Sequence, residues 1–214
     1  MKALFYKQVR LVCHPMTWVF CLFGSMFLIP SYPYTVAYFY VTLGLFFTFQ
    51  NGREQRDGDF TALLPVRKSD TVRINVRFSA VIELLMLLVS IPFACISVRI
   101  NPNGTNPVGL DCNVALFAAG LMLFALFNAV FFPAFYRTGY KVGISFWKAT
   151  IPMALAMLLC EALPHFPALD WLNDTSRSGN LHQLPLLGAG IVIFLLCTAL
   201  TERRAIARYE KVDL

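Results

Sequence analysis

Residues 51–78, NGREQRDGDFTALLPVRKSDTVRINVRF, form the longest polar stretch in a chain that is otherwise largely apolar. The stretch mixes cations with anions, in the order Arg53, Glu54, Arg56, Asp57, Asp59, Arg67, Lys68, Asp70, Arg73 and Arg77. A nucleic-acid surface is predominantly basic, whereas a mixed surface with a few apolar residues is typical of contact with another protein. We therefore expect this stretch to lie in water and to bind a protein, and we predict no nucleic-acid partner.

The composition on either side of this stretch indicates a lipid environment. Of the 214 residues, 57% are hydrophobic and 14% are charged, whereas about a quarter of the residues of a soluble domain are charged. The net charge is +6, but the basic residues flank apolar runs instead of forming one patch. Helices satisfy their own backbone hydrogen bonds in lipid, so the runs predict an all-α integral membrane protein.

The apolar runs predict six transmembrane helices, at residues 16–29, 34–50, 70–98, 113–135, 144–163 and 186–201. Pro30 and Pro33 mark a tight turn between the first two. Ser69 or Asp70 is a suitable N-cap for the third, and Pro92 predicts a kink near its far end.

Two further segments are expected at the membrane surface. Residues 1–15 carry three cations among apolar side chains, which predicts an amphipathic interfacial helix. A cleaved signal peptide is the alternative, but no small-residue cleavage site follows the apolar run. Residues 165–185 contain aromatic side chains and predict short helices at the outer face.

The basic residues indicate how the bundle is oriented. Apart from Arg99 and Arg177, every lysine and arginine falls in one of four segments that six spans place on the same side: 1–15, 51–78, 137–148 and 203–211. Cytoplasmic segments of membrane proteins are enriched in Lys and Arg. We therefore expect both termini and residues 51–78 to be cytoplasmic.

Motifs for catalysis are absent from the sequence. It contains no nucleotide-binding loop, zinc-protease helix or nucleophile elbow. An intramembrane protease needs groups converging from several spans, whereas His14, His165 and His182 lie at span ends or in the outer segment. We predict that the chain is not an enzyme and holds no metal; a site built from His165, Asp170, Asp174 and His182 is the alternative to plain solvation of these side chains.

Three polar side chains inside or beside the predicted spans are candidates for a functional role: Glu83, Asn128 and Glu161. An ionisable group in lipid costs about 3 kcal/mol unless it faces a partner or water. The alternatives are that Glu161 reaches the outer interface and that Glu83 lies near the inner one. The six cysteines lack metal-binding spacing and are interpreted as core residues, with a Cys112–Cys160 pair as the alternative.

Three short motifs follow one another along the chain. Glu54 and Gly58 precede LLPVRK at residues 63–68, FFPAFYRTGY occupies residues 131–140, and the tail reads RYEKVDL. With the basic N-terminal helix and the six spans, this order resembles the small permease subunits of bacterial ABC exporters of the second type. The resemblance covers the whole chain; it departs at residues 67–69, which read Arg-Lys-Ser where the group more often has Ser-Arg-Lys.

The resemblance implies a single permease domain, residues 1–214, in the bacterial inner membrane. Such a permease pairs with a second permease, identical or homologous, and with two ABC-type ATP-binding subunits. ATP and Mg belong to those subunits, so no cofactor is expected on this chain. The resemblance also implies a short coupling helix within residues 51–78 that enters a cleft on the ATPase. The residues expected to make this contact are Glu54, Arg56, Asp57, Gly58, Phe60, Leu63, Leu64, Pro65 and Arg67.

The local pattern agrees with a short helix in this loop. Phe60, Leu63 and Leu64 stand at i, i+3 and i+4 and would share one helix face, and Pro65 would end the helix. The alternative is an ordinary solvated loop. Exposed apolar side chains favour the interface over that alternative.

The function predicted from the sequence is export of an amphipathic or hydrophobic cargo, such as a peptide, lipid or drug, driven by ATP on the partner subunits. One alternative is a membrane scaffold or sensor that recruits a cytoplasmic protein through residues 51–78. Another is a secondary transporter that couples ions through Glu83 or Glu161, which a six-span chain without an internal repeat makes less favourable.

Overall fold

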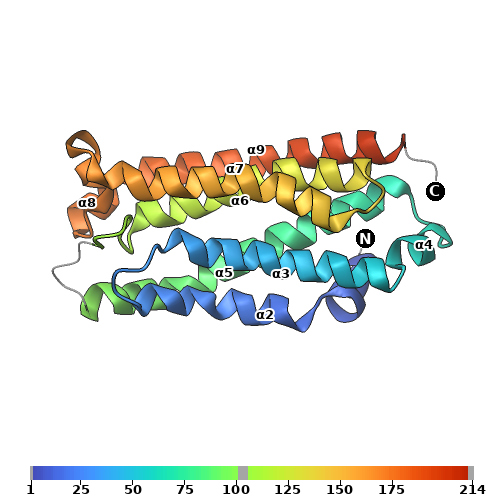
Figure 1. Cartoon of the computed structure of the whole chain (residues 1–214), viewed down its shortest axis with the longest axis horizontal. Coiled ribbons are helices and arrows are strands. Elements are labelled where there is room, and N and C mark those ends of the chain that lie inside the picture. Colours follow the sequence, from blue (N-terminus) through green and yellow to red (C-terminus); the bar gives the residue numbers. More distant parts are fainter. Residues whose placement is uncertain (1, 101–105, 212–214) are drawn as a thin grey trace.

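The computed structural model describes residues 2–100 and 106–211, and every regular element within these ranges is a helix. The stretches labelled α2, α3, α5, α6, α7 and α9 lie side by side along the long axis, with α4 at one end of the molecule and α8 at the other (Figure 1). We refer to these as the α4 end and the α8 end. An all-helical bundle is the predicted fold class.

The chain begins with a surface helix that turns sharply into the bundle. Helix α1 (Lys2–Lys7) continues as a π turn, η1 (Gln8–Val12). The axes of Lys2–Val12 and Pro15–Leu28 differ by 93°. His14 takes an extended conformation, as a residue before proline does, and its ring nitrogen accepts a hydrogen bond from the Met16 amide at 3.2 Å. The helix predicted over residues 1–15 is therefore present as far as Val12.

The next two stretches form the predicted hairpin. Helix α2 (Pro15–Cys21) tightens into a 3₁₀ segment, η2 (Leu22–Leu28), and α3 (Thr35–Glu54) returns alongside it. The turn between them contains Ser31 at φ +58°. The Thr17 hydroxyl donates to the Gly44 carbonyl at 2.7 Å and ties α2 to α3.

The remaining long helices start close to the predicted residues. Helix α5 (Lys68–Ile100) contains Pro92 without ending there, and α6 (Val114–Arg137) is capped by Asn113, whose side chain accepts from the Leu116 amide at 3.1 Å. Helix α7 (Val142–Ala162) follows after a turn. Helix α9 (Leu184–Tyr209) extends well beyond the predicted 186–201, because its charged tail stays helical after the apolar run ends.

Four helices in the described part of the chain are long and apolar enough to cross a membrane, or five if the bent N-terminal pair counts as one span. The four are Lys68–Ile100, Val114–Arg137, Val142–His165 and Arg177–Tyr209. Helix α3 is not among them, because its tyrosines, threonines and polar last turn lower its hydropathy. Its 20 residues span about 30 Å, the thickness of a bilayer core. The count of six spans stays a prediction.

Helix α6 is the centre of the bundle. In its most apolar window 67% of the helix is buried, against 28% for α7 and 17% for α9. The ring of Phe49 on α3 packs on Phe131, Phe132 and Phe135 of α6, with centroids 5.4–5.6 Å apart. Helices α7 and α9 direct most of their apolar side chains outward, as helices that contact lipid do.

Short helices cover the α8 end, as predicted for residues 165–185. They are η3 (Leu163–His165), η4 (Pro167–Asn173) and α8 (Arg177–His182). Gln183 fastens them to α6: its side-chain oxygen accepts from the Ala115 amide at 3.0 Å, and its side-chain nitrogen donates to the Trp171 carbonyl at 2.9 Å. Trp171 itself stays exposed.

Candidate functional site: the α4 junction

The polar stretch folds back over the end of the bundle as helix α4 (Asp57–Ala62). Arg56, at φ +52°, is the left-handed residue at which the chain turns from α3 into α4. Asp57 and Asp59 stand in the first turn, where negative charge favours a helix. After Ala62 the chain tightens, with the Leu63 amide donating to the Phe60 carbonyl and the Leu64 amide to Thr61, before Pro65.

The apolar residues of this segment do not all share one helix face. The helix ends at Ala62, so Leu63 and Leu64 follow it, and their exposure differs. Phe60 is 56% exposed and Leu63 is 86% exposed, while Leu64 is half-buried. The predicted apolar face of three residues is therefore reduced to two outward side chains.

A partly buried ion pair holds α4 to the N-terminal helix. The Lys7 ammonium lies 2.7 and 3.0 Å from the two carboxylate oxygens of Asp57 and donates to the Thr61 hydroxyl at 2.6 Å. The side chains of Lys7 and Asp57 are only 14% and 23% exposed. Asp57, expected to contact a partner protein, thus points into the molecule, while Glu54, Arg56 and Arg67 remain exposed.

On the side of α4 away from Lys7, a tyrosine cluster that includes Tyr140 and Tyr209 holds the helix in place. Gly58 packs against the Tyr140 ring: a Cβ placed on Gly58 would lie 3.4 Å from the ring, in van der Waals contact with it. Tyr140 follows Gly139, and both have φ near +60°, which turns the ring towards α4. Its hydroxyl donates to the Tyr209 hydroxyl at 2.6 Å. Burial beside the other tyrosines raises the pKa of Tyr140, so it stays a neutral hydrogen-bonding group.

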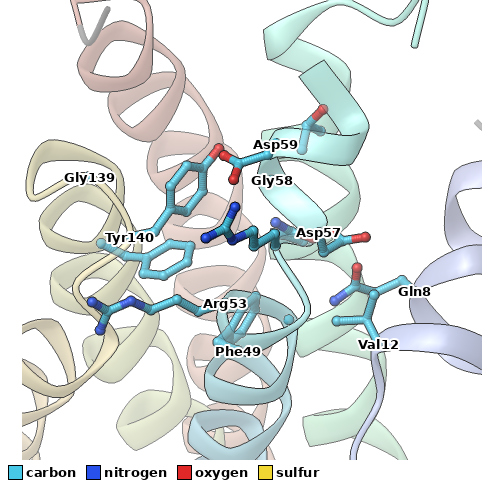
Figure 2. A pocket seen from close by; sticks show the side chains of 14 residues that line it. Gln8, Val12, Phe49, Arg53, Asp57, Gly58, Asp59, Gly139 and Tyr140 are labelled. Atoms are coloured by element: carbon cyan, nitrogen blue, oxygen red, sulfur yellow. The ribbon is translucent and has the colours of Figure 1, made fainter. Parts of the chain in front are cut away.

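Beneath α4 lies a pocket of about 250 Å³. Figure 2 shows Gly139 and Tyr140 on one side of it and Gln8 and Val12 on the other. Arg53 also lines it. The pocket separates α4 from the bundle between its two attachments, so α4 rests on side-chain contacts and not on a continuous packed core.

The three sequence motifs meet at this place. Gly58 belongs to the first, Tyr140 to FFPAFYRTGY and Tyr209 to the tail, and the Lys68 ammonium lies 5.4 Å from the Tyr209 ring centroid. The Asn75 amide donates to the Tyr136 hydroxyl at 2.8 Å and adds α5 to the same cluster. Sequence reasoning did not assign roles to these tyrosines, although two of the quoted motifs contain them.

The polar candidates within the helices lie elsewhere. Glu83 is fully buried in the middle of α5, and the Asn128 amide donates to its carboxylate at 2.7 Å. Glu83 thus faces a partner inside the bundle, and its depth relative to the inner interface stays a prediction. Glu161 is 8% exposed and accepts from the Thr35 amide and hydroxyl and from the Leu110 amide at 2.7–3.0 Å. Glu161 does not reach the surface, because it caps the start of α3.

The structure also bears on two alternatives from the sequence, a Cys112–Cys160 disulfide and a metal site. Cys112 and Cys160 are free thiols, and the Cys112 thiol points to the Phe27 carbonyl at 3.8 Å. Within the described ranges no three His, Cys, Asp or Glu side chains gather as a metal site would require. Asp174 instead accepts hydrogen bonds from Ser176, and these bonds, first from its hydroxyl and then from its amide at 2.8 Å, lower the pKa of Asp174.

A comparison with protein families places these features in context. The sequence profile described as "ABC-2 family transporter protein" matches residues 3–202. The chain belongs to the ABC-2 transporter family. It is thus a multi-pass membrane protein of the kind the resemblance indicated. No curated protein and no solved structure matches the chain at a significant level.

Proposed function

We propose that this ABC-2 protein is the transmembrane permease subunit of an ATP-driven exporter, and that α4 receives motion from separate ATP-binding subunits. The observation that carries the proposal is the exposure of Phe60 and Leu63 on a segment that is fastened to the bundle at Asp57 and Gly58. Large apolar side chains held in water beside charged ones are typical of a protein interface. Exposed Arg56 supplies part of the charged rim.

The contacts of α4 would allow it to transmit motion to the rest of the bundle. The segment lies between α3 and α5 in the chain, is tied through Lys7 to the N-terminal helix, and reaches α9 through Tyr140 and Tyr209. A displacement of α4 therefore acts on several helices at once. In this proposal ATP and Mg are held by the partner subunits, and the chain itself catalyses nothing.

The distribution of charge supports a cytoplasmic position for α4. Of the described basic residues, Arg99 and Arg177 are the two at the α8 end, and the others belong to segments at the α4 end. By the positive-inside rule the α4 end faces the cytoplasm of a bacterial cell. This orientation needs six crossings, with the α2–η2 stretch and α3 each counted as one.

We propose an apolar or amphipathic cargo, such as a peptide, lipid or drug, because the exposed faces of α7 and α9 that could meet it are apolar. Aromatic side chains from α3, α6 and α7 fill the bundle centre, as in the packing of Phe146 on Phe46 and Phe127. The outward faces of α7 and α9 leave room for a second permease, identical or homologous, beside them. In this proposal, transport proceeds by alternating access between two such halves.

The test compares two double variants of exposed apolar residues. We expect Phe60→Ala/Leu63→Ala to release the ATP-binding subunit, because truncation of an interface anchor costs about 2 kcal/mol, roughly a thirtyfold loss in affinity. Phe166→Ala/Leu181→Ala removes similarly exposed side chains at the α8 end and serves as the control.

The measurements are co-purification of the ATP-binding subunit and cargo-stimulated ATP hydrolysis. Wild-type values of both for the α4 variant would remove α4 from the mechanism. If the protein that co-purifies through α4 binds no ATP, the chain is a membrane scaffold instead.

A further inference from the structure

The middle of α5 contains a carboxyl group in an unusual environment. Glu83 has no exposed surface, Asn128 on α6 is 1% exposed, and the Asn128 amide nitrogen donates to Glu83 Oε2 at 2.7 Å. The ion pairs of the described residues join Lys7 to Asp57, Arg73 to Asp70 and Arg77 to Glu202. Glu83 takes part in none of them.

The helices packed around Glu83 provide few titratable groups near it. On α2 the Cys21 thiol points to the neighbouring Ile82 carbonyl at 3.9 Å. On α9 Glu202 is occupied by Arg77 at 2.8 Å, Arg203 and Arg204 beside it are exposed, and Cys197 stands one turn earlier. On α6 the titratable residues stand at the far end of the helix, and η2 has none. No cation faces Glu83 among these groups.

Two oxygen atoms of the pair have no hydrogen-bond donor. They are Glu83 Oε1 and Asn128 Oδ1, which are both fully buried. A carboxylate and an amide oxygen can only accept hydrogen bonds, so an ionised Glu83 leaves both atoms without a partner. Each unsatisfied buried acceptor destabilises the fold, and the charge of the carboxylate adds to this cost.

We propose that Glu83 and Asn128 form a buried binding site for one exchangeable proton. A proton on Glu83 Oε1 turns that atom into a donor to Asn128 Oδ1, while the Asn128 nitrogen continues to donate to Oε2. Both orphaned acceptors are then satisfied by a single proton in a cyclic acid–amide pair. No charge remains in the apolar interior.

The polar groups nearest to this pair lead towards the α4 end. Ser79 precedes Glu83 by one helical turn on the same face of α5, and its hydroxyl is buried without a partner. Thr201 adjoins Glu202, which pairs with Arg77, so it lies at the level of Ser79; its hydroxyl is likewise unpartnered. Neither hydroxyl is hydrogen-bonded to Glu83, so exchange of the proton requires these side chains to move.

Infrared spectroscopy of the full chain in lipid nanodiscs tests the proton directly. At neutral pH we expect a carbonyl band of a protonated carboxylic acid that shifts in heavy water and is lost in Glu83→Gln. Glutamine is neutral and of the same shape, so the melting temperature should not change. Glu202→Gln is the matched control, since Glu202 is paired with Arg77, and it should keep the band.

A second variant keeps the test decisive if Glu83→Gln does not fold. Asn128→Leu removes the hydrogen-bond partner but leaves the acid, so the band should persist and move to higher frequency. A wild-type protein without such a band, or an Asn128→Leu band at the wild-type frequency, would overturn the proposal. So would a sodium-dependent rise in melting temperature that is absent in Glu83→Gln, because it would assign the site to a metal cation.

Discussion

At the scale of single residues, burial changes the chemistry of Asp111 at the α8 end. The residue is 5% exposed, and its Oδ1 accepts from the Asn106 amide at 2.8 Å. Its other oxygen is buried with no donor among the described residues. Burial raises the pKa of Asp111 from 3.8 to about 6, since one hydrogen bond does not compensate for lost solvation.

This shift predicts a pH dependence of stability. The folded carboxyl holds its proton more tightly than the unfolded one, so the contribution is largest below pH 3.8 and is lost as pH rises to about 6. We expect the melting temperature of the wild type to fall through this window by more than that of Asp111→Asn, which cannot titrate. Melting curves at a series of pH values measure this; identical slopes would contradict the role of Asp111.

At the scale of elements, the close approach of η2 to α5 depends on one glycine. A Cβ on Gly24 would lie 2.5 Å from Ser90 Cβ and 2.8 Å from Ser90 Cα, so no side chain fits between the two helices. The absence of a side chain at Gly24 therefore allows η2 to pack closely on α5. Gly188 on α9 has no atom within 4 Å of the equivalent position.

The two glycines provide a matched comparison. We expect Gly24→Leu to force η2 away from α5. Overpacking of this kind usually destabilises a protein by about 1–3 kcal/mol. Gly188→Leu should have little effect, since leucine there meets open space and favours the helix. Thermal unfolding in detergent measures both. Equal melting temperatures would show that η2 and α5 are not in close contact.

At the scale of the whole molecule, the two ends differ in chemistry. The α4 end carries the basic segments, the lever-like helix and the tyrosine cluster, whereas the α8 end is covered by short helices with exposed Trp171 and Phe166. Such aromatic side chains are common at the membrane–water interface. The molecule is therefore asymmetric along the direction in which it would cross the bilayer.

Labelling with an impermeant thiol reagent tests this asymmetry. In a background with exposed Cys95 replaced by serine, Gln55→Cys and Lys211→Cys should react only after the cell membrane is opened. Ser178→Cys, exposed at the α8 end, should react in intact cells. Labelling of all three in intact cells would exclude the six-crossing topology with cytoplasmic termini.

The helices and their order could be predicted from the sequence because hydropathy and caps are local signals. The start of α6 after Asn113 agrees with the predicted span, whereas α5 begins at Lys68, so that neither Ser69 nor Asp70 is its N-cap. The family was predicted, as was the exposure of Phe60 and Leu63, but the third predicted residue of the apolar face, Leu64, is half-buried. The helical tail of α9 was missed, because charged residues beyond an apolar run give no hydropathy signal.

The contacts that make up the α4 junction depended on the tertiary structure. Lys7 and Asp57 are 50 residues apart and Tyr140 and Tyr209 are 69 apart, so no local pattern links them. The same holds for Glu83 with Asn128 and for Glu161 with Thr35. A side chain on a helix can face water, lipid or a neighbouring helix, and only the packing of the whole bundle decides which, because that choice depends on residues far away in the chain.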